Sequence, residues 1–238
     1  MTDKIVLPRM PSFRLDGRRA LVTGAGRGIG RAAAAALADA GAEVTLAARS
    51  ADEVEAVASA IRDAGGKAEA LTLDVTDTAT AKAEIAARGP FQTLINNAGT
   101  NRPALLADMT ESDYDAVTDL NVRASIFVAQ AVAQGLMEAK LPGSIINISS
   151  QMGHVGGPKR TVYCATKHAI EGATKAMAWE LGPQGIRVNT ICPTFIETPM
   201  TEGMLEDDAF REQVAANIAL GRVGQVEDIM GGVIYLAS

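Results

Sequence analysis

The sequence contains few cysteines and few histidines, which limits the kinds of site it could build. Cys164 and Cys192 stand in apolar stretches without Cys-x-x-Cys spacing, and only two histidines accompany them in 238 residues. This supply favours neither a disulfide scaffold nor a zinc site, so we expect no bound metal. Unpaired cysteines are typical of a reducing compartment, and we predict a cytoplasmic protein.

Blocks of positive charge and long apolar runs are also missing. The 28 acidic residues exceed the 22 basic ones, and the net charge of -6 argues against nucleic acid or an anionic membrane surface as a partner. The opening "MTDKIVLPRMPSFRLDG" has charges and prolines where a signal peptide has an apolar run. No stretch is long and apolar enough to span a bilayer. We therefore expect no nucleic-acid and no membrane partner, and we interpret residues 1–14 as an N-terminal extension.

Apolar runs alternate regularly with helical patterns along the rest of the chain. Runs at 18–24, 43–49, 67–75, 91–99, 143–150 and 186–193 predict buried parallel strands. Helical patterns at 29–41, 51–65, 78–88, 112–139 and 161–181 separate them. Right-handed crossovers would make this a doubly wound sheet. We predict an α/β fold: one doubly wound Rossmann-type domain across residues 1–238, with helices on both faces of a parallel β-sheet.

A glycine-rich turn, "LVTGAGRGIGRA", joins the first predicted strand to the first predicted helix. Gly24, Gly28 and Gly30 stand where the backbone turns, approaches a ligand and packs the helix on the sheet. A helix N-terminus at this place offers free N–H groups to a phosphate. The spacing is neither G-x-G-x-x-G nor a P-loop, and a tight turn without a ligand is the alternative. Its place in a doubly wound sheet favours dinucleotide binding.

The residues at the end of the second predicted strand indicate which cofactor is preferred, NAD or NADP. Enzymes of this architecture that use NAD place an acidic residue there for the ribose 2′-hydroxyl, whereas arginine suits the 2′-phosphate of NADP. Here the strand ends in Ala48 and Arg49, with no acid before Asp52. Arg27 in the glycine turn is a second cation that could reach the same phosphate. The sequence favours NADP, with NAD as the alternative.

Several motifs together resemble the classical short-chain dehydrogenase/reductase family. They are "TGAGRGIG" at 23–30, "NNAG" at 96–99, "DLNV" around Asn121, "NISS" ending at Ser150, and "YCATK" at 163–167. The resemblance in order and spacing extends from about Leu15 over nearly the whole remaining chain. Each motif alone is weakly specific, but their combination is highly specific.

The resemblance implies a catalytic tetrad. Tyr163 would be the general acid or base, Lys167 its partner, and Asn121 the residue that holds a proton-relay water. Of Ser149 and Ser150, the family's spacing of thirteen residues before the tyrosine selects Ser150 to hold the substrate oxygen. A free tyrosine has a pKa of ~10. An ammonium one helical turn away, together with the positive nicotinamide of the oxidised cofactor, would lower that pKa.

The resemblance also assigns cofactor contacts. Asp74 and Val75 would contact the adenine, Asn97 the adenosine ribose, and Ile196 and Thr198 the carboxamide and phosphate end. Asp74 as a helix cap and Thr198 as a turn residue are the ordinary alternatives. The expected cofactor-binding set is Gly24, Arg27, Gly28, Ile29, Gly30, Arg49, Asp74, Val75, Asn97, Ala98, Gly99, Tyr163, Lys167, Ile196 and Thr198.

Three departures from the family pattern are visible. Thr166 replaces the usual serine of Tyr-x-x-Ser-Lys, and Thr194 replaces the glycine that usually follows Pro193. The sequence ends at "GGVIYLAS", where family members continue into a seventh strand. We therefore expect that strand to be missing here. The resemblance implies a homo-oligomer, either a tetramer or a dimer, to whose interface the strand would contribute.

The sequence thus predicts an oxidoreductase that transfers a hydride between NADP(H) and the carbonyl/alcohol pair of a small substrate. The alternatives are an NAD-dependent alcohol, polyol or sugar dehydrogenase, a lyase or epimerase, and a non-catalytic dinucleotide sensor. Residues 151–160, with Met152 and His154, and residues 200–220 should line the substrate pocket. We also predict that residues 198–220 form a mobile lid. Sugars and polyols, 3-oxoacyl thioesters and cyclic ketones remain open as substrates.

Overall fold

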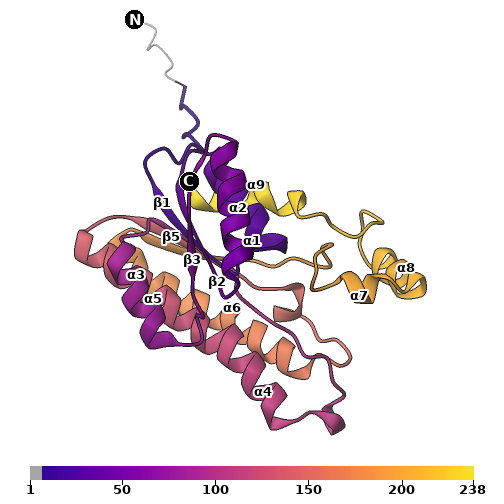
Figure 1. Ribbon diagram of the computed structural model, residues 1–238. Coiled ribbons are helices and arrows are strands. Elements are labelled where there is room, and N and C mark those ends of the chain that lie inside the picture. The colour runs from indigo at the N-terminus through magenta and orange to yellow at the C-terminus, as the bar shows by residue number, and fades with distance from the viewer. Residues whose placement is uncertain (1–6) are drawn as a thin grey trace, which may run out of the picture.

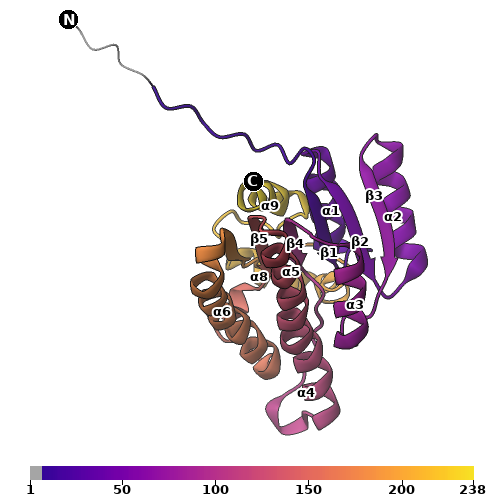
Figure 2. The same cartoon turned by 90° about the vertical axis from the view of Figure 1, so that its left-hand side faces the viewer.

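Six parallel strands form one sheet in the order β3-β2-β1-β4-β5-β6. This computed structural model describes residues 7–238 (Figure 1). Figure 2 shows the sheet from β5 through β4, β1 and β2 to β3. The order reverses between β1 and β4, so their carboxyl ends open a crevice of the kind that binds ligands in α/β sheets. The strands are β1 Arg19–Thr23, β2 Glu43–Ala48, β3 Lys67–Thr72, β4 Thr93–Asn96, β5 Gly143–Ile148 and β6 Ile186–Ile191.

Helices cover both faces of this sheet. Alternate strand residues point to opposite faces, so Val22 and Ile95 join one core cluster while Leu21 and Leu94 join the other. The first cluster packs under α1 Gly28–Asp39, α2 Ala51–Asp63 and α9 Glu227–Ala237. The second packs under α3 Thr78–Arg88, α5 Ser125–Ala139 and α6 Thr161–Leu181. The predicted doubly wound α/β fold is confirmed.

The helix predicted over 112–139 is interrupted in its middle. The structure has α4 at Glu111–Thr118, a π-helical turn at Asp119–Ala124, and α5 beyond it. The predicted long helical segment is confirmed, and the π-helical turn inside it is an addition that the sequence pattern did not show. Asn121 lies inside the π-helical turn and is 2% exposed. Such turns re-aim a side chain or free a backbone group, and they are frequent at functional sites.

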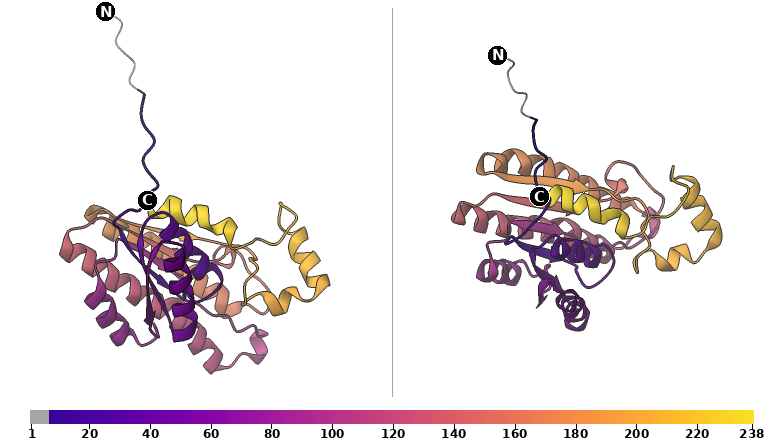
Figure 3. Two further views of the ribbon diagram at one scale, coloured as in Figure 1. Left: turned by 45° about the horizontal axis from the view of Figure 1, so that its top comes forward. Right: turned by 90° about the horizontal axis from the view of Figure 1, so that it is seen from above.

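The segment between β6 and α9 forms a small unit of its own. Helices α7 Glu202–Leu205 and α8 Asp208–Ala216 enclose a separate cluster of Leu205, Val214 and Val223. Both views in Figure 3 show this unit projecting from the layered body. Short 3-10 turns occupy η1 Leu106–Asp108, η3 Gln151–Gly153 and η4 Gly182–Gln184.

The N-terminal extension reaches the last helix at one point. Of this extension, residues 1–6 lie outside the described part. Phe13 within it packs on Tyr235 of α9, with ring centroids 6.4 Å apart. Among residues 7–238, β3 and β6 are the two edge strands of the sheet. Within the same residues, no helix has the length and hydrophobicity needed to cross a membrane.

Candidate active site

A cleft with a volume of about 560 Å³ opens at the crevice between β1 and β4. It extends from the glycine turn past the ends of β2 and β3 to Thr198 in the segment after β6. Most of the predicted cofactor-binding residues line it, although they come from five separate segments of the sequence. They are Gly24, Arg27, Gly28, Ile29, Arg49, Asp74, Val75, Asn97, Ala98, Gly99 and Thr198.

The glycine turn has the backbone that a close-fitting ligand site requires. Gly28 has a φ of +55°, a value that side-chain-bearing residues rarely adopt, and α1 begins at this residue. Gly30 does not line the cleft. A Cβ at Gly30 would stand 2.2 Å from the carbonyl oxygen of Gly24, so this glycine lets α1 pack directly on the turn. The first turn of α1 therefore faces the cleft with its free N–H groups.

Asn97 and Thr23 hold the glycine turn against the next strand. The Asn97 side-chain amide donates to the carbonyl oxygens of Thr23 and Gly24 at 3.0 and 3.1 Å. The Thr23 hydroxyl accepts from the backbone N–H groups of Asn97 and Ala98, both at 3.0 Å. Asn97 thus lines the cleft while its amide fixes the turn. We did not single out Thr23 from the sequence, although a polar residue ending a buried strand is a usable signal.

The end of the cleft near β2 contains both predicted arginines and one unexpected acid. Arg27 and Arg49 are exposed and line the cleft, as does Ala48, the last residue of β2. Glu53, in the first turn of α2, places a carboxylate oxygen 3.9 Å from an Arg27 guanidinium nitrogen. The sequence pattern did not indicate Glu53, because the residue that distinguishes the cofactors is expected directly after the strand. The positive charge at this end is therefore partly offset.

Tyr163 and Lys167 lie on one face of α6, as their spacing predicted. The Lys167 Nζ atom is 5.6 Å from the centroid of the Tyr163 ring, and it donates to the carbonyl oxygen of Ile148 at 2.8 Å. The lysine is 7% exposed. Gly99 lies over it, since a Cβ on this glycine would be 3.9 Å from Nζ. Lys167 is therefore a buried cation beneath the cleft floor.

Burial governs the protonation of both groups. It lowers the pKa of Lys167 to about 8, against the opposing influence of Cys192 and Glu171. It raises the pKa of Tyr163, although the hydrogen bond with Ser150 and the charge of Arg160 act in the other direction. The expected lowering of the Tyr163 pKa by Lys167 was wrong for the protein chain itself. Desolvation raises the pKa of the phenol by more than the neighbouring groups lower it.

Ser150 and Asn121 reach the same region from other elements. The Ser150 hydroxyl caps η3 by accepting from the backbone N–H of Met152 at 3.1 Å. The Asn121 side chain accepts from the N–H of Thr100 at 2.8 Å and donates to its carbonyl oxygen at 2.9 Å. Asn121 also donates to the Thr166 hydroxyl at 3.2 Å. The threonine that replaces the family's serine thus keeps a polar role.

A second, smaller cavity of about 70 Å³ lies beside Ser150 and Tyr163. Asn101 and Met200 line both this cavity and the large cleft, so the two adjoin. Met152 lines the small cavity, as predicted for the loop after Ser150. Gln151, Arg160 and Met204 also line it, and they belong to the two segments that were predicted to form the substrate pocket. The sequence did not single out Asn101 and Phe195, because they join this wall only in the fold.

Two predicted residues lie elsewhere. Ile196 is buried against Gly224, with which it forms a β-bridge, and its side chain does not line the cleft. His154 turns away from the small cavity towards the carboxylate of Glu171, with a nitrogen-to-oxygen distance of 3.7 Å. His154 therefore has a different neighbourhood from the one that the loop sequence predicted.

The crevice position, the glycine turn and the buried helix face beside it define a class of protein: the dinucleotide-binding α/β enzymes. Sequence comparison narrows this class to one family. The family model for short chain dehydrogenases matches residues 18–209. The chain belongs to this family, as the motifs indicated, and it is an oxidoreductase.

Curated relatives and solved structures agree with this assignment. The chain is 40% identical over 228 residues to a D-erythrulose reductase of Gallus gallus, covering 96% of this chain and 91% of the relative. It is 39% identical over 226 residues to an L-xylulose reductase of Bos taurus, with coverages of 95% and 91%. A gluconate 5-dehydrogenase of Burkholderia cenocepacia, solved with NADP and tartrate, has a TM-score of 0.91, 38% identity and coverages of 95% and 90%.

Proposed function

We propose that this oxidoreductase reduces the ketone of a small polyhydroxylated substrate with NADPH. One observation carries the proposal: Ser150 and Tyr163 line a small cavity that adjoins the dinucleotide-sized cleft. Two relatives are named for the reduction of erythrulose and xylulose, which supports a sugar or polyol substrate. A 3-oxoacyl thioester or a cyclic ketone is less well supported by these relatives.

The residues present fit NADP(H). The N-terminus of α1 and the turn around Gly28 would hold the pyrophosphate, because Gly28 lines the cleft and the helix begins there with free N–H groups. The Thr198 side chain lies opposite, 3.4 Å from the place of a Cβ on Gly28. Asp74 and Val75 would contact the adenine, and Arg27 and Arg49 the 2′-phosphate. Asn97, Ala98, Gly99 and Thr198 would complete the wall, with Tyr163 and Lys167 at the nicotinamide ribose. Ile196 could contribute through its backbone alone, since its side chain is buried elsewhere.

The proton chemistry follows from the arrangement of three side chains. The bound cofactor supplies the hydride chemistry at its nicotinamide ring. Ser150 uses its hydroxyl proton to hold the substrate oxygen, because its own oxygen already accepts from the N–H of Met152. Tyr163 donates its proton to that oxygen, and its raised pKa keeps the phenol protonated near neutral pH. This protonation state suits carbonyl reduction better than alcohol oxidation.

Lys167 and Asn121 would act behind the phenol. Lys167 places a positive charge beneath the developing phenolate and helps Tyr163 to release its proton. Asn121 lies in the π-helical turn, where its side chain is fixed by Thr100 and Thr166. We assign to Asn121 the positioning of a relay water that would return a proton from solvent to the Lys167 side of the site.

The alternative that a specific observation favours is an NAD-dependent dehydrogenase of the same substrates. Glu53 offers a carboxylate at the end of the cleft where the 2′-substituent of the ribose would lie. A carboxylate accepts well from a 2′-hydroxyl and repels a 2′-phosphate. In our proposal the positive charge of the two arginines outweighs the negative charge of Glu53, so that the 2′-phosphate of NADP is preferred.

The proposal is tested by incubating the purified chain with small ketoses, polyols and 3-oxoacyl thioesters, each with NADPH and with NADH. Loss of the absorbance of the reduced nicotinamide should be fastest with a ketose and NADPH. Turnover confined to thioesters would contradict the substrate class. No turnover with either cofactor would contradict the activity.

We propose a homo-oligomer, a dimer or tetramer. Ile126 and Phe127 on α5 and Trp179 on α6 are exposed apolar side chains, and Trp179 is 86% exposed. A monomeric mass by light scattering would contradict this. The two free cysteines, Cys164 and Cys192, support the proposed cytoplasmic location, which localisation of the tagged chain in its own cell would test.

A further inference from the structure

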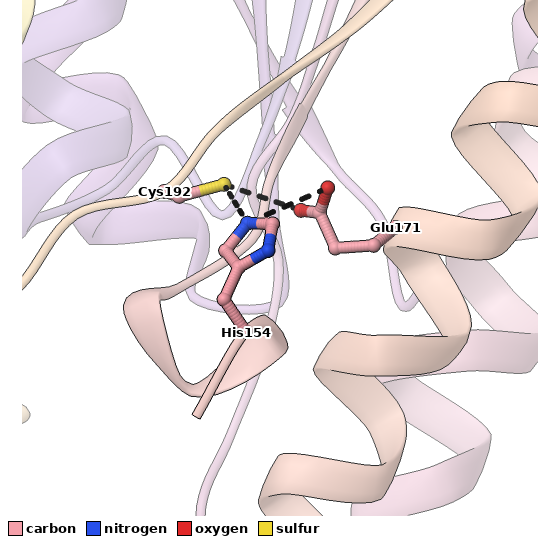
Figure 4. Close-up of side chains that lie close together, drawn as sticks. All are labelled: His154, Glu171 and Cys192. Carbon is pink, nitrogen blue, oxygen red and sulfur yellow. Dashed lines mark hydrogen bonds and ion pairs between the residues drawn. The ribbon is translucent and has the colours of Figure 1, made fainter. Parts of the chain in front are cut away.

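Three side chains that could bind a metal converge behind the candidate active site. His154 comes from the end of η3, Glu171 from α6, and Cys192 from the residue after β6 (Figure 4). Their ligand atoms all lie within 4.8 Å of one another. None of the three lines the large cleft or the small cavity. This group is therefore separate from the site described above.

We propose that His154, Glu171 and Cys192 form a binding site for a zinc ion. The Cys192 Sγ atom is 3.4 Å from His154 Nε2 and 3.2 Å from Glu171 Oε1, and His154 Nε2 is 3.7 Å from Glu171 Oε2. Zinc bonds of about 2.3 Å to sulfur and about 2.0–2.2 Å to nitrogen and oxygen give tetrahedral edges of about 3.3–3.6 Å. The observed separations are close to these edges, but each Glu171 oxygen faces a different partner, and with one oxygen as the ligand the three atoms lie within 4.8 Å of one another. A rotation of the Glu171 carboxylate would therefore accompany the binding of one ion.

The chemistry of the three donors also suits zinc. Imidazole, thiolate and carboxylate are its usual protein ligands, and a thiolate selects against magnesium and calcium. Binding would replace the Cys192 thiol proton, which leaves to solvent, so that thiolate and carboxylate balance the two charges of the ion. A water would take the fourth position. The exposed His154 side chain, 53% exposed, gives the ion a way in.

The surroundings hold the carboxylate in a fixed orientation. Glu171 is 7% exposed, and the Thr190 hydroxyl donates to its Oε2 at 3.2 Å. Burial tends to raise the pKa of Glu171, but the polar groups around it, among them the Cys192 thiol and the Thr190 hydroxyl, outweigh burial and lower that pKa. A hydroxyl group that fixes the orientation of a buried, ionised carboxylate is typical of the support that metal ligands have in proteins.

Sequence spacing could not show this site. Thirty-eight positions separate His154 from Cys192, and Glu171 lies between them on another element. Our expectation of no metal rested on the absence of a local ligand motif. Bound zinc would tie together the loop after Ser150, the helix that carries Tyr163 and Lys167, and the end of β6.

The test is metal binding to the purified chain without an affinity tag. Competition with a chromophoric chelator should show one Zn²⁺ per chain. Because the chain has two histidines and two cysteines, the histidine and the cysteine ligand each have a matched control. His154→Asn and Cys192→Ser should weaken binding by at least about 10-fold, whereas His168→Asn and Cys164→Ser should not.

Cobalt provides a second, spectroscopic readout. Co²⁺ added to the wild type should give a near-ultraviolet thiolate-to-cobalt band, which Cys192→Ser abolishes and Cys164→Ser retains. Circular dichroism shows that each variant is folded, and the exposed His154→Asn change leaves the core untouched. The proposal is overturned if the wild type shows no saturable one-to-one binding. It is equally overturned if the control variants lose as much affinity as the ligand variants.

Discussion

Two residues, Lys167 and Tyr163, determine how the proposed reaction should depend on pH. Lysine is charged below its pKa, and burial lowers the pKa of Lys167 to about 8. Burial raises the pKa of Tyr163, so the phenol stays protonated to higher pH. We expect kcat/KM for carbonyl reduction to be level below about pH 8 and to fall above it, since this parameter reports groups of the free enzyme. If kcat/KM stayed level to about pH 10, the fall above that pH would be assigned to Tyr163 instead of Lys167.

A second prediction at this scale concerns the choice of cofactor. Charge-assisted hydrogen bonds from Arg27 and Arg49 contribute ~1.5–3 kcal/mol each before solvent screening. Both arginines are exposed, which reduces that contribution. We still expect the wild type to prefer NADP over NAD by about tenfold or more in kcat/KM. The double change Ala48→Asp with Arg49→Ala should reverse the order.

Glu53→Gln isolates the unexpected acid, because it removes the charge that lies 3.9 Å from Arg27. The NADP preference should rise several-fold. Asp52→Asn, on the same helical turn but outside the cleft lining, is the matched control and should change little. Equal kcat/KM values for the two cofactors in the wild type would refute the arginine argument.

The individual site residues differ in how far the sequence could predict them. The tetrad candidates Ser150, Tyr163 and Lys167 were found from motif spacing, and the fold places them in one region. Glu53 was missed because its approach to Arg27 depends on how the first turn of α2 packs beside the glycine turn. The raised pKa of Tyr163 was missed because desolvation depends on tertiary packing, which no local pattern reports.

At the scale of elements, the turn between β1 and α1 should be highly sensitive to substitution. A Cβ at Gly30 would be 2.2 Å from the Gly24 carbonyl oxygen and 2.5 Å from the Asn97 amide nitrogen. We expect Gly30→Ala to destabilise the protein by about 1–3 kcal/mol or more and to weaken cofactor binding. Denaturant unfolding and cofactor titration measure the two effects.

The control for that change is Gly172→Ala, in the middle of α6. An added Cβ at Gly172 meets nothing within 4 Å, so the change should stabilise by about 0.5–1 kcal/mol. If Gly30→Ala were as stable as wild type and bound cofactor normally, the glycine turn would not have the tight packing described here.

The segment 198–220 is predicted to act as a lid. Its helices α7 and α8 have only the small cluster of Leu205, Val214 and Val223 as a core, while Met200 and Met204 line the small cavity. A unit with so few buried contacts should open more readily than the sheet. Hydrogen exchange should therefore slow in 198–220 when cofactor is added. Equal protection with and without cofactor would indicate a fixed helix pair.

The π-helical turn at Asp119–Ala124 is an element that the sequence could not reveal. Residues 112–139 have the spacing of one continuous helix, and one extra residue in a turn leaves that pattern almost unchanged. The backbone of the structure identifies the turn, and the Asn121 side chain within it bonds Thr100 and Thr166. The family resemblance pointed to Asn121 without indicating its backbone conformation.

For the whole molecule, the layered fold was predictable because the central strands, such as β1 and β4, are short runs buried on both faces. The edge strand β3 was wrongly predicted to be buried, since Lys67, Glu69 and Thr72 are exposed. The regular strand–helix alternation then allows few topologies. The side-chain clusters that cross the fold were not predictable in the same way. His154, Glu171 and Cys192 meet because η3, α6 and the end of β6 pack together, and local spacing contains no trace of that contact.

The central claim is that Tyr163 is the acid of an NADPH-dependent reduction, and one comparison tests it most directly. Wild type and Tyr163→Phe are mixed with NADPH and a ketose that the wild type turns over, and the reduced-nicotinamide absorbance is followed. The variant keeps the ring and its packing but lacks the transferable proton. We predict that NADPH affinity stays nearly unchanged while turnover is abolished. Turnover within a few-fold of the wild type would contradict the account.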